Sequence, residues 1–322
     1  VNPFLADLIE AKLTPLAASK FCASYDRLMA ELEIEPSDGL LIGDMPPTMT
    51  EPGVNGRFVF AADVYATVRA IVRKSTDLPP EEARLLRVLL GSVLVPNSNV
   101  TINGKGRRYR RGWETRPRSA GDLIASLDHA VDTAAADLTS YAAPRRGSHV
   151  VHRGDARTAL MSVEDADAVI FSPPYPNSFD YTDVYNLELW MLGYLKSGPD
   201  NRTLRHQTLR SHVQTKWRET QRVAASETLD DTLDALRRMR SNLWNRDIPE
   251  MVGFYFDDLS MVFAQLRRVL APGRHAVVAI GDSQYGGVHI DVASILVECV
   301  QPLGFRLTES GAIRSMRSSA QH

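Results

Sequence analysis

The chain has 322 residues, of which 44% are hydrophobic and 24% are charged, and its formal net charge is -2. This composition is typical of a folded protein with a core, and it excludes a collagen-like chain, a disulfide scaffold and disorder throughout. No apolar run reaches the roughly 18 residues that a membrane helix needs. The distant cysteines Cys22 and Cys299 argue against a zinc knuckle and indicate a reduced, cytoplasmic setting. The net charge does not favour a polyanionic partner, although it averages over local basic patches.

The first part of the chain is predicted to be mostly helical. Apolar side chains three and four positions apart predict an amphipathic helix over residues 4–13, with Asn2 and Pro3 at its start. The same spacing predicts a helix over residues 85–94, after an acidic first turn. Residues 38–56 are rich in Pro, Gly and Asp and predict a loop.

After residue 147 the pattern alternates between strand and helix. Short apolar runs predict strands over residues 149–152, 167–171, 275–280 and 305–308. Helices are predicted over residues 247–270 and 292–300, the first ended by Ala271-Pro272-Gly273. This alternation predicts an α/β fold with a parallel, doubly wound, Rossmann-like sheet and mostly helical insertions. The run over residues 167–171 is typical of a strand buried on both faces.

The tetrapeptide Ser172-Pro173-Pro174-Tyr175 follows the strand predicted over residues 167–171, at the end where open α/β sheets bind ligands. Its prolines fix two φ angles and remove two N–H donors, so the remaining polar groups are acceptors. The Ser172 hydroxyl and the Pro173 carbonyl could accept both hydrogens of a nucleobase amino group. Tyr175 could stack on the same base, a contact of about 1–3 kcal/mol. The structural alternative is a proline-rich surface turn or a polyproline ligand.

This tetrapeptide resembles the catalytic motif (Asp/Asn/Ser)-Pro-Pro-(Tyr/Phe/Trp) of the S-adenosylmethionine-dependent DNA amino-methyltransferases, which methylate cytosine N4 or adenine N6. The resemblance implies catalytic roles for Ser172, Pro173, Pro174 and Tyr175, with S-adenosylmethionine as the cofactor. It also implies double-stranded DNA as the substrate and a cognate restriction nuclease as a candidate partner. Serine in first place is commoner among the cytosine-N4 enzymes, which favours cytosine N4 over adenine N6. RNA or a protein glutamine amide is a more distant substrate, and a non-catalytic nucleic-acid-binding remnant of the fold is the rival of a different class.

Two other segments resemble cofactor-binding motifs of this family. Asn2-Pro3-Phe4 is similar to the motif beside the cofactor ribose and adenine, and Gly154-Asp155-Ala156 to the motif whose acidic side chain binds the adenine. Without the resemblance, Asp155 is equally compatible with two interpretations, a cofactor-binding residue and an ordinary loop aspartate. The glycine turn Phe-x-Gly-x-Gly, which binds the methionine part of the cofactor in this family, is absent from the chain. We expect that turn upstream of Val1, so that this chain is a fragment that binds the cofactor poorly.

Two basic regions are candidates for DNA binding. Residues 105–118 interleave arginines with Tyr109 and Trp113, and a second basic cluster spans residues 202–222. The structural alternative for the first is a solvated basic loop. Histidines in the second lack carboxylates or thiols at metal-ligand spacing, so we predict no metal site. The candidate DNA contacts are Arg107, Arg108, Tyr109, Arg110, Arg111, Asn177, Arg205 and Arg210.

The resemblance divides the chain into core segments and insertions. Residues 1–16, 147–182 and 247–322 are predicted to form the methyltransferase core. Residues 17–146 and 183–246 are predicted insertions, and both are candidates for target recognition.

Overall fold

The structure is a computed structural model that describes residues 2–103, 106–141, 148–217 and 221–313. The chain forms two compact units. Unit 1 comprises Val1–Arg153 and Tyr181–Leu204, and unit 2 comprises Gly154–Asp180 and Arg205–His322. The boundaries of these units differ from those of the five segments predicted from the sequence. The division into five segments stays a prediction. No helix in the described ranges has the length and apolar character needed to cross a bilayer.

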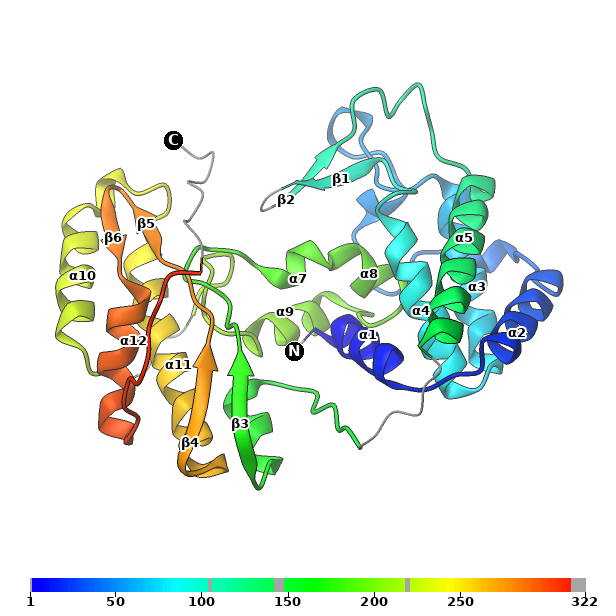
Figure 1. The fold of residues 1–322 in the computed structure, drawn as a ribbon. Coiled ribbons are helices and arrows are strands. Elements are labelled where there is room, and N and C mark those ends of the chain that lie inside the picture. The colour runs from blue at the N-terminus through cyan, green and yellow to red at the C-terminus, as the bar shows by residue number, and fades with distance from the viewer. Residues whose placement is uncertain (1, 104–105, 142–147, 218–220, 314–322) are drawn as a thin grey trace. The chain divides into compact units, whose positions relative to one another are not determined.

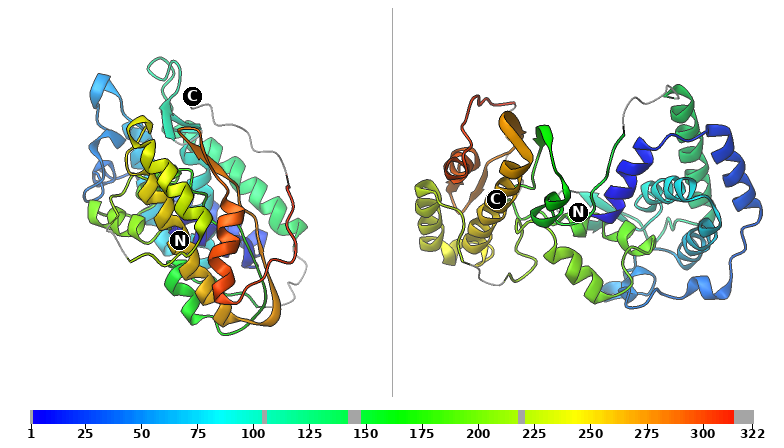
Figure 2. Two further views of the ribbon diagram at one scale, coloured as in Figure 1. Left: turned by 90° about the vertical axis from the view of Figure 1, so that its left-hand side faces the viewer. Right: turned by 90° about the horizontal axis from the view of Figure 1, so that it is seen from below.

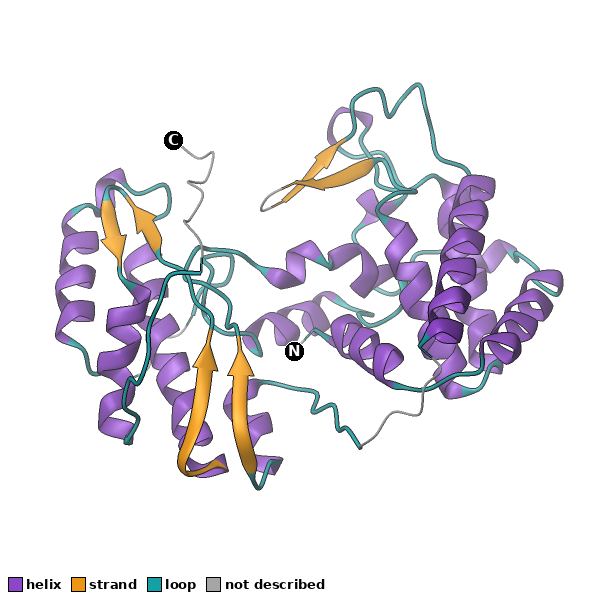
Figure 3. Cartoon of the chain, in the orientation of Figure 1, coloured by secondary structure: helices purple, strands orange, loops and turns teal. Residues whose placement is uncertain are grey.

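Unit 1 is mostly helical, with one small β-hairpin (Figures 1 and 3). Its helices are α1 Pro3–Leu13, α2 Ala18–Ala30, α3 Ala62–Lys74, α4 Pro80–Leu94, α5 Ala120–Ser140, α7 Tyr181–Val184, α8 Asn186–Met191 and α9 Gly198–His206, whose last two residues belong to unit 2. Short 3-10 turns are η1 Pro36–Gly39, η2 Pro47–Met49, η3 Val54–Gly56 and η4 Ser75–Asp77. The antiparallel hairpin consists of β1 Val100–Asn103 and β2 Gly106–Tyr109.

The two helices predicted in unit 1 are confirmed. Asn2 caps α1, since its Oδ1 accepts a hydrogen bond of 3.0 Å from Phe4 N, and Pro3 occupies the first turn. Helix α4 packs against α1 and α5. The approach of α1 depends on Gly91, because a Cβ there would lie 2.5 Å from the Phe4 ring. The close approach holds the N-terminal end of α1 against the core of the unit.

Helix α8 carries a carboxyl group into the core of unit 1. Glu188 is 7% exposed, and its Oε2 has no hydrogen-bond partner among the described residues. Burial raises the pKa of Glu188 from 4.5 to about 7. The fold therefore favours the protonated form, and the stabilisation is complete below pH 4.5 and lost as the pH rises through about 7.

We expect the free energy of unfolding of unit 1 to fall by about 3 kcal/mol between pH 4.5 and pH 7 on account of Glu188. Urea unfolding at pH 5 and pH 8 measures most of this change. Glu188→Gln should remove most of the pH dependence, whereas Glu33→Gln, at an exposed position, should leave it intact. If the free energy of unfolding depends equally on pH in the wild type and in Glu188→Gln, the pH dependence does not come from Glu188.

Unit 2 combines three long helices with short strands. Its helices are α6 Ala156–Ala159, α10 Glu227–Arg238, α11 Ile248–Val269 and α12 Val292–Val300, and its 3-10 turns are η5 Leu160–Ser162, η6 Arg240–Asn242 and η7 Gln301–Leu303. Its strands are β3 Ala166–Phe171, β4 Leu270–Val278, β5 Ser283–Tyr285 and β6 Val288–Ile290. Helices α10, α11 and α12 pack on one another and lie side by side in the left-hand view of Figure 2. The predicted helices 247–270 and 292–300 are confirmed as α11 and α12.

Strand β3 pairs in parallel with β4, and the intervening chain contains α11. This pairing confirms two of the predicted strands and an α/β arrangement. Strands β5 and β6 form a separate antiparallel pair. Since β3 and β4 run in the same direction, their carboxyl ends meet at one edge of the pair (Figure 1).

The other two predicted strands are wrong, because residues 149–152 and 305–308 form no strand. Arg153, just after the first run, is held to α1 by hydrogen bonds of 2.6 Å to Asp7 and 2.7 Å to Glu10. In the second run, Phe305 packs edge-on against Phe263 of α11, at 5.3 Å between ring centroids. In both places side-chain contacts to helices replace the expected strand pairing.

Strand β3 is buried on one face only among the described residues, against our prediction of burial on both. Val169 and Phe171 pack against the core that α11 provides. Ile170 on the opposite face is 78% exposed, and Val277 of β4 is 56% exposed. A doubly wound sheet needs helices on both faces, so the described residues supply only half of that architecture.

Candidate active site

The loop Ser172-Pro173-Pro174-Tyr175 begins where β3 ends, at the carboxyl edge of the parallel pair. Ala279 N donates to Phe171 O at 3.0 Å, and the Ser172 hydroxyl donates to Ala279 O at 2.8 Å. The serine is exposed, and its Oγ lies 3.4 Å from the Tyr175 hydroxyl. Because Ala279 O takes the serine proton, the lone pairs of Ser172 Oγ remain able to accept a hydrogen bond.

The residues after this loop hold it in place through hydrogen bonds. The Tyr285 hydroxyl donates to Pro176 O at 3.0 Å, and Asn177 N donates to Tyr175 O at 2.7 Å. Ser178 has a φ of 57°, a left-handed conformation, and its N–H donates to Ser211 O at 3.0 Å. The loop is thus preformed. Sequence reasoning missed Tyr285 and Ser211, which are distant in the chain and belong to no motif.

A second tyrosine lies beside Tyr175. Tyr255 of α11 is fully buried, and its hydroxyl has no hydrogen-bond partner among the described residues. Burial, and in smaller part the neighbouring Tyr175, raises the pKa of Tyr255, so its hydroxyl remains a neutral donor. An unsatisfied buried hydroxyl next to the half-buried ring of Tyr175 suits a site that binds polar, planar ligands.

Unit 2 also contains a buried network of ion pairs. Asp258 of α11 is completely buried and accepts hydrogen bonds from Arg210 N at 2.8 Å, from Arg210 Nη2 at 2.7 Å and from Arg157 Nη1 at 2.9 Å. The Arg210 guanidinium also lies 4.6 Å from the centre of the Phe254 ring. Arg210 was predicted to contact DNA, but its side chain is committed to this interior network. This side chain is therefore not available to contact DNA.

The predicted cofactor residue Asp155 belongs to this network too. It caps α6, and both of its carboxylate oxygens accept hydrogen bonds from Arg157. Although burial opposes the charge, the Asp155 and Asp258 carboxylates raise the pKa of Arg157, so its guanidinium stays charged. Most of the hydrogen-bonding capacity of the Asp155 carboxylate is therefore used by Arg157. The other predicted cofactor residue here, Ala156, is the first residue of α6.

The other predicted cofactor residues, Asn2, Pro3 and Phe4, lie at the start of α1 in unit 1. Asn2 is 8% exposed, and its amide nitrogen Nδ2 is buried without a hydrogen-bond partner among the described residues. The Phe4 ring packs against Tyr185 and Tyr194, at 5.9 and 6.3 Å between ring centroids. Asn2 thus offers a free buried donor, whereas Phe4 forms part of the core.

The predicted arginine-rich region forms the β1–β2 hairpin and the turn after it. Arg107, Arg108 and Arg111 are exposed, as a DNA-contacting role requires. Arg110 differs from them, because its guanidinium donates to Val100 O at 2.9 Å and to Val95 O at 2.6 Å. Arg110 therefore holds the hairpin to the end of α4. Lys105, predicted as part of the same run, lies outside the described residues.

The aromatic residues of this region form the base of the hairpin. Tyr109 and Trp113 lie 5.6 Å apart, and Phe58 packs on Trp113 at 5.3 Å. The exposed Arg57 lies over the Tyr109 ring at 5.3 Å. Arg57 is a surface cation that sequence reasoning missed, because it is far from residues 105–118 in the chain.

The remaining candidate DNA contacts are Asn177 and Arg205, both in unit 2. Asn177 is half-buried next to Tyr175, and Arg205 Nε forms an ion pair of 3.1 Å with the buried Asp180. Arg218 of the second basic cluster lies outside the described residues. Among the described residues, no group of three His, Cys, Asp or Glu side chains is placed to hold a metal ion.

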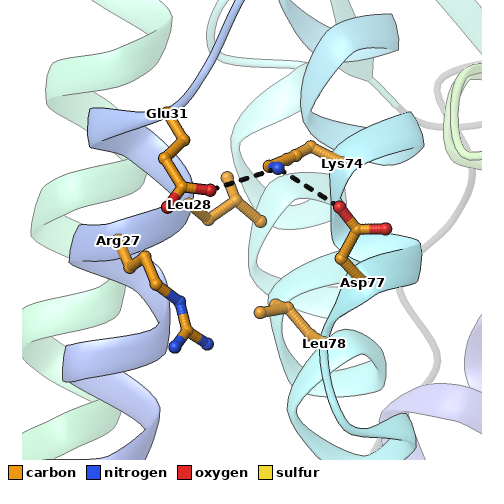
Figure 4. A pocket seen from close by; sticks show the side chains of 6 residues that line it. All are labelled: Arg27, Leu28, Glu31, Lys74, Asp77 and Leu78. Carbon is orange, nitrogen blue, oxygen red and sulfur yellow. Dashed lines mark ion pairs between the residues drawn. The ribbon is translucent and has the colours of Figure 1, made fainter.

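Figure 4 shows a cavity of about 210 Å³ in unit 1, apart from all predicted site residues. It is lined by α2 and by the segment around η4. Lys74 bridges its two acidic residues, Glu31 and Asp77, at 3.2 Å each. Its charges are thus largely paired with one another, and it lacks aromatic side chains, so it offers little to a ligand.

Comparisons with known proteins relate the chain to one class of enzyme. It is 30% identical to the Type II methyltransferase M.AvaI of Nostoc sp. and to the protein of that name from Anabaena variabilis, over 271 residues that cover 75% of this chain and 56% of each relative. It is 31% identical to the Type II methyltransferase M.BsoBI of Geobacillus stearothermophilus, over 186 residues that cover 51% of this chain and 36% of the relative. No family model and no solved structure matches it significantly. The chain spans about half the length of the curated relatives it matches, and over three quarters of its own length it is similar to Type II methyltransferases.

Proposed function

We propose that this chain carries the catalytic loop of a DNA methyltransferase that transfers a methyl group from S-adenosylmethionine to the exocyclic amino group of a flipped base. The main support is the preformed Ser172–Tyr175 loop at the carboxyl end of β3, in a chain similar to Type II methyltransferases. We propose cytosine N4 as the acceptor, because serine occupies the first position of the loop. Adenine N6 is the alternative.

The loop would act mainly by positioning the base. The amino nitrogen of cytosine is a poor nucleophile, since its lone pair is delocalised into the ring. Ser172 Oγ and the Pro173 carbonyl, which accepts no hydrogen bond from the described residues, would accept the two amino hydrogens. The nitrogen then becomes more tetrahedral and its lone pair more available. Tyr175 would hold the base in this orientation, and flipping the base costs a few kcal/mol that stacking offsets in part.

The residues present fit the cofactor only in part. S-adenosylmethionine supplies an electrophilic methyl group on its sulfonium. The unpartnered Nδ2 of Asn2 fits an acceptor on the adenosine part of the cofactor. Asp155 fits less well, since Arg157 already occupies both of its oxygens. We therefore propose Asn2 of unit 1 as a cofactor contact. Asp155 and Ala156 of unit 2 are assigned only a structural role, as the N-cap and the first residue of α6.

A direct test is to incubate the protein and DNA with isotopically labelled S-adenosylmethionine and to analyse the nucleosides by mass spectrometry. Label in N4-methylcytosine supports the proposal in full, and label in N6-methyladenine supports the alternative acceptor. The Pro173→Ala variant serves as a control, because it releases the φ angle of residue 173 and keeps the backbone carbonyl that is the proposed acceptor. Label in neither nucleoside, with a protein that covers the full length of its relatives, would count against the proposed activity.

The exposed arginines of the hairpin are proposed to contact phosphates. We expect the triple variant Arg107→Ala, Arg108→Ala, Arg111→Ala to weaken binding to all duplexes alike. The slope of log affinity against log salt should shrink by about one unit for each phosphate that is no longer neutralised. Fluorescence anisotropy at several salt concentrations measures this slope. Arg110→Ala should instead destabilise the hairpin, and the exposed Arg306→Ala should change neither property. Weaker binding confined to one DNA sequence would point to base contacts.

A further inference from the structure

Unit 2 contains a cavity of about 320 Å³ that none of the roles above uses. It is formed by the loop over residues 212–217 and by residues 240–254, which include the first turns of α11. Its volume lies within the range of small-molecule sites, roughly 300–1,000 Å³. The side chains that line it include Lys216, Trp217, Arg240, Asp247, Glu250 and Phe254.

The cavity wall is hydrogen-bonded to the segment that follows the catalytic loop. Val213 N donates to Ser178 Oγ at 3.4 Å, and Ser178 N donates to Ser211 O at 3.0 Å. Ser178 is three residues beyond Tyr175. The cavity therefore adjoins the chain that leaves the candidate active site, although it shares no residue with the Ser172–Tyr175 loop.

The aromatic side chains of the cavity are fixed by their neighbours. Trp217 Nε1 donates to His212 O at 3.1 Å, and the Trp217 ring contacts the rings of His206 and His212 at 5.4 and 5.5 Å. Phe254 lies against the Arg210 guanidinium, which Asp258 holds. Such rings lose little conformational freedom when a planar ligand packs on them.

The polar part of the cavity offers hydrogen-bond acceptors. Glu250 pairs through one oxygen with Arg240, but its Oε2 is buried and has no partner among the described residues. Asp247 is the N-cap residue of α11, yet its side chain accepts no hydrogen bond from the helix backbone. A buried carboxylate oxygen without a donor is costly, so a ligand that donates hydrogen bonds would be favoured here.

We propose that this cavity binds a nucleobase that carries an exocyclic amino group, cytosine or adenine, as a second base site beside the catalytic loop. This proposal rests on the proposed function, because the bound base would be an extrahelical base of the DNA substrate. Carboxylates accept hydrogen bonds from such amino groups, and aromatic rings stack on every base. The exposed Lys216 is placed to contact the nucleotide phosphate. Thymine has a carbonyl oxygen where cytosine has the amino group, so the same carboxylates repel it.

Calorimetric titration of the chain with dCMP, dAMP and dTMP tests this selectivity. We expect dCMP or dAMP to bind at least tenfold more tightly than dTMP, as one good pair of base contacts allows. Glu250→Gln and Asp247→Asn should reduce that preference at least threefold, and Trp217→Ala should abolish binding. Asp234→Asn, an exposed carboxylate of α10 outside the cavity, is the matched control. In Tyr175→Ala, which removes the proposed stacking contact of the catalytic loop, the preference for dCMP or dAMP over dTMP should persist, and this separates the cavity from the catalytic loop.

Two results would overturn the proposal: equal binding of the three nucleotides, or no binding of any of them at millimolar concentration. If DNA is methylated while the nucleotides fail to bind, the second site is absent and the proposed activity stands. If the nucleotides bind with the stated preference while DNA is not methylated, the second site stands and the proposed activity fails. Because Glu250→Gln also weakens the ion pair with Arg240, the milder Asp247→Asn keeps the test informative if the first variant unfolds.

Discussion

Tyr175→Ala is expected to lower the rate of methyl transfer to DNA roughly tenfold to a hundredfold while the fold stays intact. The expected size follows from the loss of base stacking, about 1–3 kcal/mol, with 1.4 kcal/mol for each factor of ten. The fold should survive because the loop is held by Ala279, Tyr285 and Ser211 rather than by the Tyr175 ring. Single-turnover transfer from labelled S-adenosylmethionine measures the rate, and circular dichroism checks the fold.

Two further variants distinguish the contribution of the Tyr175 ring from the contributions of the Tyr175 and Ser172 hydroxyl groups. Tyr175→Phe keeps the stacking surface and should retain most of the rate. Ser172→Ala removes one of the two proposed acceptors and should lower the rate, although it leaves the Pro173 carbonyl in place. Near wild-type transfer by both Tyr175→Ala and Ser172→Ala would mean that the loop is a structural turn.

Asp258→Asn is expected to destabilise unit 2 by about 3–5 kcal/mol. This carboxylate is completely buried and balances Arg157 and Arg210, so its neutralisation takes a buried negative charge from Arg210 and leaves Arg157 with Asp155 alone. For a unit of this size the destabilisation corresponds to a fall of roughly 6–20 °C in the melting temperature. Differential scanning calorimetry measures the shift.

The control for this variant is Asp234→Asn on α10. Asp234 pairs with Arg237 at 2.9 Å, but both side chains are more than half exposed, and exposed pairs contribute about 1 kcal/mol or less. Equal melting temperatures for the two variants would show that the Asp258 network contributes no more than a surface pair. A loss of methyl transfer at temperatures where Asp258→Asn is still folded would show that the network also orients the segment after the catalytic loop.

Elements whose signals are local could be predicted from sequence. Helix α12 has the predicted bounds, since Asp291 caps its start and a 3-10 turn and Gly304 follow its end. Helix α1 is marked in the same way by Asn2 and Pro3. The Ser172–Tyr175 loop was also placed correctly after its strand, because an apolar run and two prolines are both local features.

Features that depend on distant partners could not be predicted. An arginine in a basic run looks the same whether it is exposed, as Arg107 is, or bound to backbone carbonyls, as Arg110 is. Arg210 likewise owes its burial to Asp258, 48 positions away in the chain. Tyr255 shows no motif at all, because only packing places it beside Tyr175. Side-chain partners, more than secondary structure, therefore decide which charged and aromatic residues remain for function.

The half-covered β3–β4 pair has a consequence for how this chain behaves in concentrated solution. Apart from β4, no strand among the described residues pairs with β3, and its outer face presents Ile170. An apolar strand with free backbone groups is a template for pairing with another chain. Asp167 near the start of β3 is exposed and pairs with Arg274, which places charge at only one end of the strand. Expressed alone, this chain is therefore expected to self-associate through β3, and a charged residue in place of Ile170 should delay that association.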